Sequence, residues 1–163
     1  MIISLLFILF GALSAFVLFS LDDLFIFGGV VYGLATVAFL PILHKKSMSY
    51  IRNILLRSVW ITGSGLSFYL AIMTFVLFNS NVYQDETVSF MLAGAVGSLL
   101  LVVAYTIMAY FTNQKLNWLL VILVIVTASV VPVIVMWSGI EKEYLYVTWQ
   151  FFVTLLLALM VRK

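Results

Sequence analysis

Residues Leu116–Trp137 read LNWLLVILVIVTASVVPVIVMW, and between Leu119 and Val126 they carry no polar side chain. A run of about 20 apolar residues is long enough to cross the roughly 30 Å hydrocarbon core of a bilayer as a helix. Backbone amides have no water partner in lipid, so a helix that satisfies its own hydrogen bonds is expected there. This stretch therefore predicts a transmembrane helix.

Five further apolar runs of similar length occupy most of the remaining chain. With the first run they give six expected spans: Ile2–Phe19, Leu24–Leu43, Ile54–Phe78, Thr87–Phe111, Leu116–Trp137 and Tyr144–Val161. The 163 residues are 66% hydrophobic and 9% charged, whereas soluble domains are roughly 45–50% apolar and about 25% charged. We therefore expect an all-α membrane protein, a compact bundle of six transmembrane helices in one integral membrane domain (residues 1–163).

The charged side chains alternate in sign from one polar break to the next. Seven of the eight Lys and Arg residues follow the second, fourth and sixth runs or begin the third: Lys45, Lys46, Arg52, Arg57, Lys115, Arg162 and Lys163. The other breaks hold all six acids together with Lys142. Because Lys and Arg are retained on the cytoplasmic side, this pattern predicts both termini in the cytoplasm of a bacterial-type cytoplasmic membrane.

The first run could instead be a cleaved signal peptide. It has no Lys or Arg before it and no A-x-A site after it, and its apolar stretch is longer than that of a signal peptide. We therefore expect a retained helix.

Several classes of chemistry are excluded by residues that the sequence lacks. Without cysteine there is no disulfide, zinc thiolate site, iron–sulfur cluster or thiol nucleophile. No ionisable residue falls near the middle of an expected span, which counts against proton relays, ion-coupled carriers and voltage sensors. The one histidine, His44, lies at an expected helix end, so a haem held by two histidines of one chain cannot form. No long basic run indicates nucleic acid, and we expect no cofactor.

Acidic residues gather at the expected outer ends of the spans. The candidates for a cation site or a lipid-modifying catalytic centre are Asp22, Asp23, Asp85 and Glu86. The orientation of the chain explains acids on the outer side equally well. We therefore expect no resident metal and keep a lipid-modifying enzyme as the third alternative.

Small residues mark the faces on which helices are expected to pack. Close backbone contact between helices in lipid needs glycine, alanine or serine, because lipid supplies no hydrophobic drive for association. The second expected span contains Gly29-x-x-x-Gly33, and the fourth contains Gly94 and Gly97. Such a motif serves dimerisation or seats a neighbouring helix of the same chain, and we expect the second use.

Hydroxyl, phenol and amide side chains recur at helical spacing in three expected spans. The candidate ligand residues are Tyr69, Ser98, Tyr105, Tyr146, Gln150 and Thr154. Gln150 is the only amide well inside any span. Two interpretations remain open: hydrogen bonds from helix to helix, or a polar lining around a small ligand with Tyr69 and Tyr105 as walls.

The two prolines occupy similar places in the two halves of the chain. Pro41 lies in the second expected span and Pro132 in the fifth, which are the middle helices of two three-helix halves. Interrupted helices at matching places are typical of inverted transporter repeats. Proline is also common near membrane helix ends, and residues 1–80 and 81–163 show no other match.

Three function classes follow from these patterns. The six-helix plan with both ends inside resembles the architecture of small solute-binding membrane subunits of vitamin importers, although no motif carries that likeness. The first expectation is transport or binding of a neutral or amphipathic small molecule, with partner subunits because the chain has no nucleotide-binding loop. The second is a non-catalytic accessory or assembly subunit of a larger membrane complex. A cavity between the third, fourth and sixth spans would favour the first, and a filled bundle with an exposed glycine groove the second.

Overall fold

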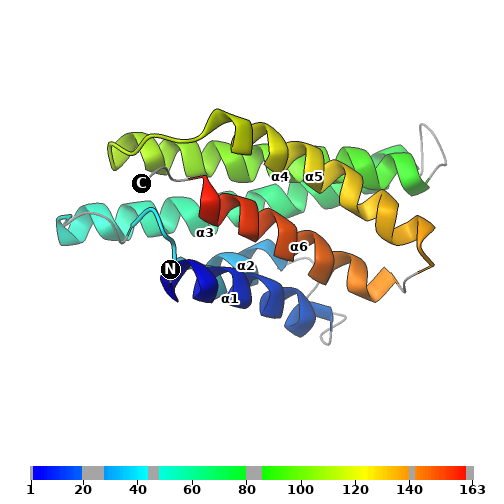
Figure 1. Cartoon of the computed structure of the whole chain (residues 1–163), viewed down its shortest axis with the longest axis horizontal. Helices are drawn as coiled ribbons and strands as arrows, with labels where there is room; N and C mark the ends of the chain where they lie inside the picture. Colours follow the sequence, from blue (N-terminus) through cyan, green and yellow to red (C-terminus); the bar gives the residue numbers. More distant parts are fainter. Residues whose placement is uncertain (1, 20–27, 44–47, 80–85, 140–141, 161–163) are drawn as a thin grey trace.

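The computed structural model describes residues 2–19, 28–43, 48–79, 86–139 and 142–160; the side chains of residues 15–19, 142–143 and 146 are outside that description. This part of the chain is built from six helices (Figure 1). They are α1 (Ile2–Phe19), α2 (Gly28–Val37), α3 (Tyr50–Leu77), α4 (Glu86–Phe111), α5 (Trp118–Trp137) and α6 (Lys142–Leu159). The expected all-α class is confirmed.

Most helix bounds lie within a few residues of the expected ones. The start of α5 shows what fixes such a boundary. Asn117 is its N-cap, and the Asn117 side chain accepts a 3.2 Å hydrogen bond from the Leu119 N–H. A capping side chain of this kind satisfies a backbone N–H that has no partner within the helix. The helix therefore begins at Trp118 rather than at Leu116.

The expected span Leu24–Leu43 needs a correction. Its helix α2 ends at Val37, and residues 38–43 form turns. Pro41 has no N–H to donate to the Val37 carbonyl, and its ring disfavours helical backbone at the residue before it. The Val37 carbonyl instead accepts a 3.0 Å hydrogen bond from Nη1 of Arg57 on α3.

Residues 40–43 are buried inside the bundle although they are not helical. Leu40 and Ile42 are fully buried. Non-helical backbone at such depth needs partners within the protein, and Nε2 of Gln114 donates a 2.6 Å hydrogen bond to the Ile42 carbonyl. This segment therefore packs as part of the core.

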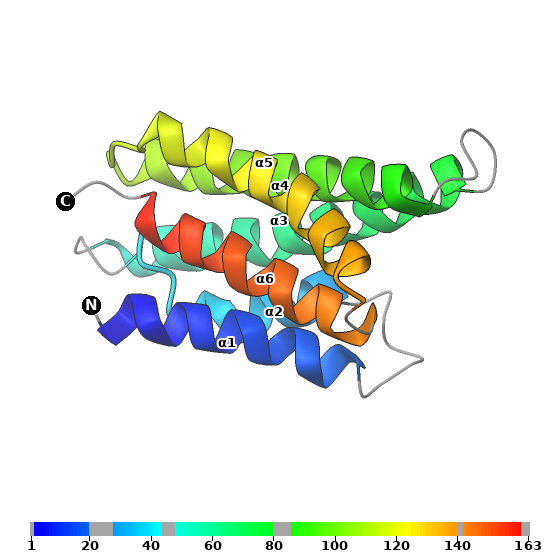
Figure 2. The same cartoon turned by 45° about the vertical axis from the view of Figure 1, so that its right-hand side comes forward.

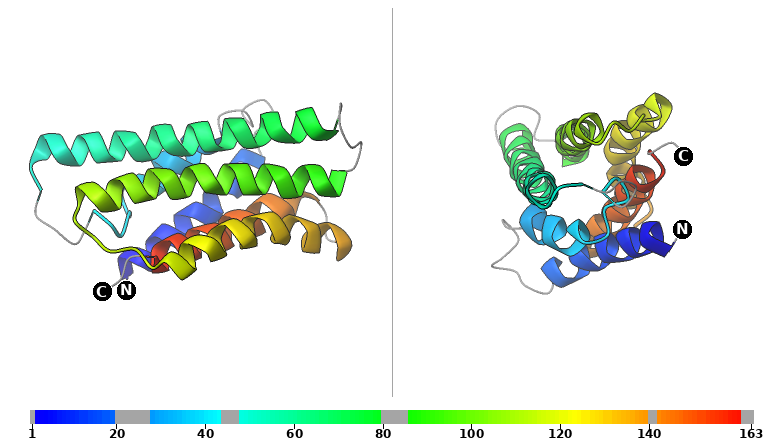
Figure 3. Two further views of the ribbon diagram at one scale, coloured as in Figure 1. Left: turned by 90° about the horizontal axis from the view of Figure 1, so that it is seen from above. Right: turned by 90° about the vertical axis from the view of Figure 1, so that its left-hand side faces the viewer.

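The six helices form a closed ring in chain order, with α1 packed against α6 (Figure 3). Figure 2 shows α6 running between α1 and α5. Across the ring, the described backbones of α3 and α6 do not come into contact. The start of α1 and the end of α6 lie at the same end of the bundle.

The outer surface of this bundle is apolar and its interior contains polar groups. Large exposed side chains such as Leu9, Leu99 and Ile122 cover the helices. The buried polar residues are Ser14, Thr36, Ser64, Ser67, Ser89, Ser98, Thr112, Gln150 and Thr154. Among the described helices, α3, α4 and α5 are long and apolar enough to cross a membrane.

Candidate functional site

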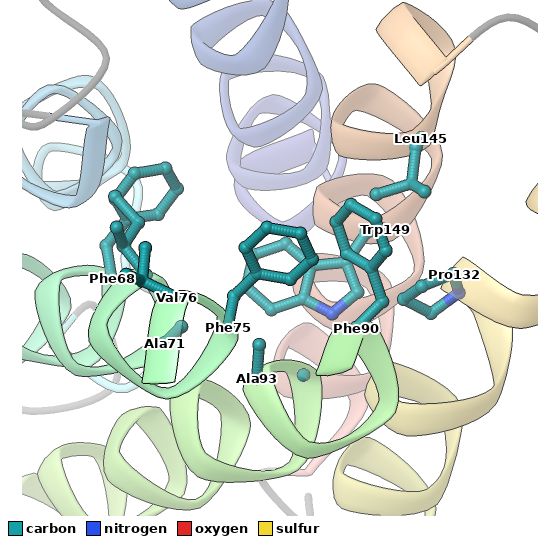
Figure 4. Close-up of a pocket in the computed structure, with 11 residues that line it drawn as sticks. Phe68, Ala71, Phe75, Val76, Phe90, Ala93, Pro132, Leu145 and Trp149 are labelled. Carbon is teal, nitrogen blue, oxygen red and sulfur yellow. The ribbon is translucent and has the colours of Figure 1, made fainter. Parts of the chain in front are cut away.

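A cavity of about 270 Å³ lies between α3, α4, α5 and α6 (Figure 4). It is lined by Phe68, Ala71, Ile72, Phe75, Val76, Phe90, Ala93, Gly94, Pro132, Leu145 and Trp149. These residues belong to the second half of α3, the first half of α4, the end of α5 and the start of α6. Because consecutive helices run in opposite directions, these parts meet at the end of the bundle where α3 and α5 end and α4 and α6 begin. In the sequence, the breaks at these helix ends bear acids.

Beside the cavity, two of its lining residues, Gly94 and Trp149, meet the backbone carbonyl of Ala128 on α5. Pro132 lies inside α5 and has no N–H, so the Ala128 carbonyl lacks its usual helical partner. The indole Nε1 of Trp149 on α6 donates a 3.1 Å hydrogen bond to it. A Cβ atom at Gly94 on α4 would overlap the same oxygen. Glycine and proline together therefore let α4, α5 and α6 meet here, with the Trp149 ring fixed as a wall.

Aromatic rings form much of the cavity wall. The ring centroids of Phe75 and Phe90 are 4.5 Å apart with an interplanar angle of 40°. Figure 4 shows these rings around the cavity together with Trp149. Among the described lining residues, the Trp149 N–H is the only polar side-chain group, and its hydrogen bond goes to the Ala128 carbonyl. The site thus offers ring faces and methyl groups to a ligand.

A second, much smaller cavity of about 10 Å³ lies beside the first. Gly29, Tyr32, Ser64, Ser67, Leu101, Gln150 and Val153 line it, and Phe68 and Trp149 line both cavities. Its volume is about that of one water molecule. The side chains of Phe68 and Trp149 therefore separate the apolar cavity from the polar interior.

Gln150 and Thr154 belong to a hydrogen-bonded network that joins four helices. The Ser14 hydroxyl on α1 lies 3.0 Å from Oε1 of Gln150 and 2.7 Å from the Gly11 carbonyl, and its one hydrogen is shared between these two acceptors. The Thr154 hydroxyl donates to the Gln150 carbonyl at 2.5 Å. Its hydrogen is then used, so the Tyr32 hydroxyl on α2 is the donor in the 2.9 Å bond to Thr154.

The network continues to α3. Oγ1 of Thr36 accepts a 2.9 Å hydrogen bond from the indole N–H of Trp60. Its own hydrogen goes to the Tyr32 carbonyl at 2.7 Å. These contacts favour the helix-to-helix interpretation for the polar side chains of α6.

Three other candidate ligand residues, Tyr69, Ser98 and Tyr105, take no part in the hydrogen bonds described above for this network. Tyr69 is 45% exposed on the outside of α3 and is not a wall of the cavity. Ser98 is buried and donates to the Ala95 carbonyl of its own helix at 3.1 Å. The Tyr105 ring packs edge-on against Trp60, and its buried hydroxyl has no partner among the described residues. The Tyr146 side chain lies outside the described residues.

The glycines singled out in the sequence lie at contacts between neighbouring helices. A Cβ at Gly29 would overlap the Ser64 carbonyl of α3, and one at Gly33 would overlap the Ser64 hydroxyl. The carbonyl of Gly97 on α4 accepts a 2.5 Å hydrogen bond from the Ser67 hydroxyl of α3. Gly94 faces α5, as described above.

Only one of the four acidic candidates lies among the described residues. Asp22, Asp23 and Asp85 fall outside the described residues, and Glu86 is the first residue of α4. Within the described ranges, no group of three or more His, Asp or Glu side chains is placed to hold a metal ion.

Sequence reasoning missed the aromatic walls because it searched for polar side chains. A signal was available in the pairing of Gly94 with Pro132, which allows helices to approach closely and interrupts a hydrogen-bond ladder. Comparison with protein-family models, with curated proteins and with solved structures finds no match to the chain. The functional argument therefore rests on the cavity.

Proposed function

We propose that the protein is a six-span integral membrane protein, with both termini in the cytoplasm, that binds a neutral or amphipathic small molecule between α3, α4, α5 and α6. In this proposal it acts as a solute-binding or transport protein together with partner membrane subunits. The observation that carries the proposal is the cavity of about 270 Å³, close to the lower end of the roughly 300–1,000 Å³ typical of ligand pockets. Protein interiors are otherwise close-packed, so a void of this size calls for an occupant.

The distribution of exposed side chains supports the membrane placement. Apolar residues cover the middle of the helices, and large exposed aromatic residues lie near both ends. Trp118 is 66% exposed near the basic end, and Trp137 is 79% exposed near the acidic end. Trp and Tyr at two levels are typical of the two membrane interfaces. The helices α1 and α6 have 18 residues each, so each helix is about 27 Å long at a rise of 1.5 Å per residue.

Mass spectrometry after purification in a mild detergent tests the proposal. We expect a small molecule to co-purify with the unchanged protein and to be lost from an Ala93→Leu variant, because Ala93 lines the cavity. A Tyr69→Phe variant, altered on the outside of α3, should retain it. If no small molecule co-purifies, the binding proposal fails. If the Ala93→Leu variant retains the molecule, the cavity is not its binding site.

A second candidate function, as an accessory subunit, is favoured by an outer groove between α3 and α4. The groove has a volume of about 430 Å³ and is lined by Leu55, Ser58, Val59, Thr62, Gly63, Leu66, Leu100, Val103, Ala104 and Ile107. Its lining includes the small residues Ser58, Gly63 and Ala104, of which Gly63 and Ala104 lie against each other between α3 and α4, and small residues are enriched where helices dock in lipid. If another chain docks here, a Thr62→Trp variant should release a co-purifying protein, whereas Ala93→Leu should not. The absence of any co-purifying protein would count against this candidate.

A further inference from the structure

We infer that the ligand of the apolar cavity is a hydrocarbon chain of the acyl or isoprenoid type, whose polar head stays outside the cavity. The inference rests on the proposed binding function. It narrows a neutral or amphipathic molecule to one chemical class, and it specifies which part of that molecule is enclosed.

The walls exclude a hydrogen-bonding solute. The lining residues are Phe, Ala, Ile, Val, Gly, Pro, Leu and Trp, and the Trp149 N–H is already bonded to Ala128. A buried polar group without a partner costs about 1–3 kcal/mol. A solute that gave up its water hydrogen bonds would recover none from these side chains, whereas a methylene chain has none to lose.

The polar interior is out of reach of a ligand in this cavity. Gln150 and Tyr32 border the small second cavity, which Phe68 and Trp149 separate from the first. Their hydrogen bonds run to Ser14 and Thr154. An amphipathic molecule therefore cannot place its polar head toward the core, and the head has to lie at the opening.

The cavity reaches the apolar outer surface of α3 at Val76. Val76 lines the cavity and is 52% exposed, and its exposed neighbours on α3 are Met73 and Leu77. A chain entering there comes from a hydrocarbon environment. Because the chain then leaves one apolar environment for another, the hydrophobic contribution to the binding free energy nearly cancels. The favourable contribution comes from dispersion contacts in a space that would otherwise be empty. For a free molecule arriving from water, each buried methylene adds about 0.8 kcal/mol.

Two sources share this chemistry: a chain of a bilayer lipid and a free hydrophobic molecule. Fluorescence of Trp149 distinguishes them because its ring is part of the wall. Trp118→Phe and Trp137→Phe together remove the two exposed indoles, leaving Trp149 and the fully buried Trp60. A matched triple variant that also carries Trp149→Phe measures the fluorescence of Trp60 alone, which is subtracted as background.

Both proteins are reconstituted in nanodiscs and exposed to three quenchers. The quenchers are phospholipids brominated on their acyl chains, a free brominated fatty acid methyl ester, and acrylamide as a neutral polar solute. We expect brominated chains to remove most of the Trp149 emission and acrylamide to leave it. Quenching by the phospholipid identifies a bilayer lipid, and quenching by the added ester alone identifies a free molecule.

Filling the opening provides the control. Val76→Phe should abolish quenching, and Val76 is exposed enough to accept the larger ring. Ala93→Leu fills the cavity from α4 and should do the same, whereas Met73→Phe on the neighbouring outer surface should leave quenching intact. Quenching by acrylamide alone, lost in Val76→Phe, would overturn the hydrocarbon inference and retain the binding function. If quenching persists in both filled variants, the inference fails. If no probe quenches Trp149 at all, the cavity is not reachable, and both the inference and the proposed function fail.

Discussion

The indole Nε1 of Trp149 donates a 3.1 Å hydrogen bond to the carbonyl of Ala128, the acceptor that Pro132 leaves without its helical partner. A corresponding arrangement occurs in the first half of the chain. There the carbonyl of Val37, four residues before Pro41, accepts a 3.0 Å bond from Arg57.

In each half a proline lies four residues after a carbonyl of the middle helix and cannot donate to it, and a side chain of the following helix donates instead. The donors differ, and α2 ends before Pro41 while α5 continues past Pro132. The two prolines thus share a physical role at corresponding places, which is the kind of correspondence that an inverted repeat would produce.

The bond between Trp149 and Ala128 should matter only while Pro132 is present. Trp149→Phe leaves a buried carbonyl unsatisfied and should lower the free energy of unfolding by about 1–3 kcal/mol. Pro132→Ala supplies the missing N–H, so Trp149→Phe should be less destabilising in that background. Denaturation of the four proteins in detergent gives the coupling energy of the cycle. Equal costs in both backgrounds would show that the indole N–H contributes nothing at this carbonyl.

Gly29→Ala and Gly65→Ala should have different effects on stability. A Cβ at Gly29 meets the backbone carbonyl of Ser64, which cannot turn aside, whereas one at Gly65 meets only a Val30 methyl group at 3.0 Å. Gly29→Ala should therefore destabilise the protein by about 1–3 kcal/mol through overpacking.

Gly65→Ala should be neutral or mildly stabilising, because alanine is about 1 kcal/mol the better helix former. Thermal unfolding in detergent measures both variants. Equal melting temperatures would mean that α2 and α3 are not in close contact at Gly29.

The proposed six-span topology predicts the location of fused reporter domains. Reporters after Lys46, Lys115 and Lys163 should lie in the cytoplasm, and reporters after Asp23, Glu86 and Glu143 outside. The physical reason is the retention of Lys and Arg on the cytoplasmic side. A single inversion in the series would contradict the six-span arrangement.

The all-α class and most helix bounds follow from the sequence because the length of an apolar run fixes a helix in lipid. The early end of α2 was harder to predict. Leu40 and Ile42 are as apolar in a buried turn as in a helix, and only Pro41 and the side chains of Arg57 and Gln114 make the turn stable.

The cavity was beyond sequence reasoning for a related reason. In a helix that is apolar on every side, a phenylalanine such as Phe75 gives no sign of whether it faces lipid or protein. Tyr69 shows the converse, because a phenol at helical spacing defines a face without saying where that face points. The structure places Tyr69 outward.

The partition formed by Phe68 leads to the last prediction, which uses Gln150→Cys as a reporter. The chain has no native cysteine, so labelling by a small water-soluble thiol reagent reports this position alone. The cavity beside Gln150 has about 10 Å³ of space, enough for roughly one water molecule and too little for a reagent. Gln150→Cys by itself should therefore remain unlabelled.

Adding Phe68→Ala removes one wall between the two cavities and should allow labelling by a small apolar reagent such as methyl methanethiosulfonate, but not by the water-soluble one. Tyr69→Ala, at the adjacent outward position, should allow neither. A buried Phe→Ala change costs about 3–5 kcal/mol, so Phe68→Leu serves as a milder second variant, and size-exclusion chromatography checks that each protein is folded. Rapid labelling of Gln150→Cys without a second change would mean that the polar network lines a wet path and that Gln150 contacts a ligand. If labelling by the apolar reagent fails in both Phe68 variants, Phe68 is not the barrier, and the two cavities are separated by Trp149 alone.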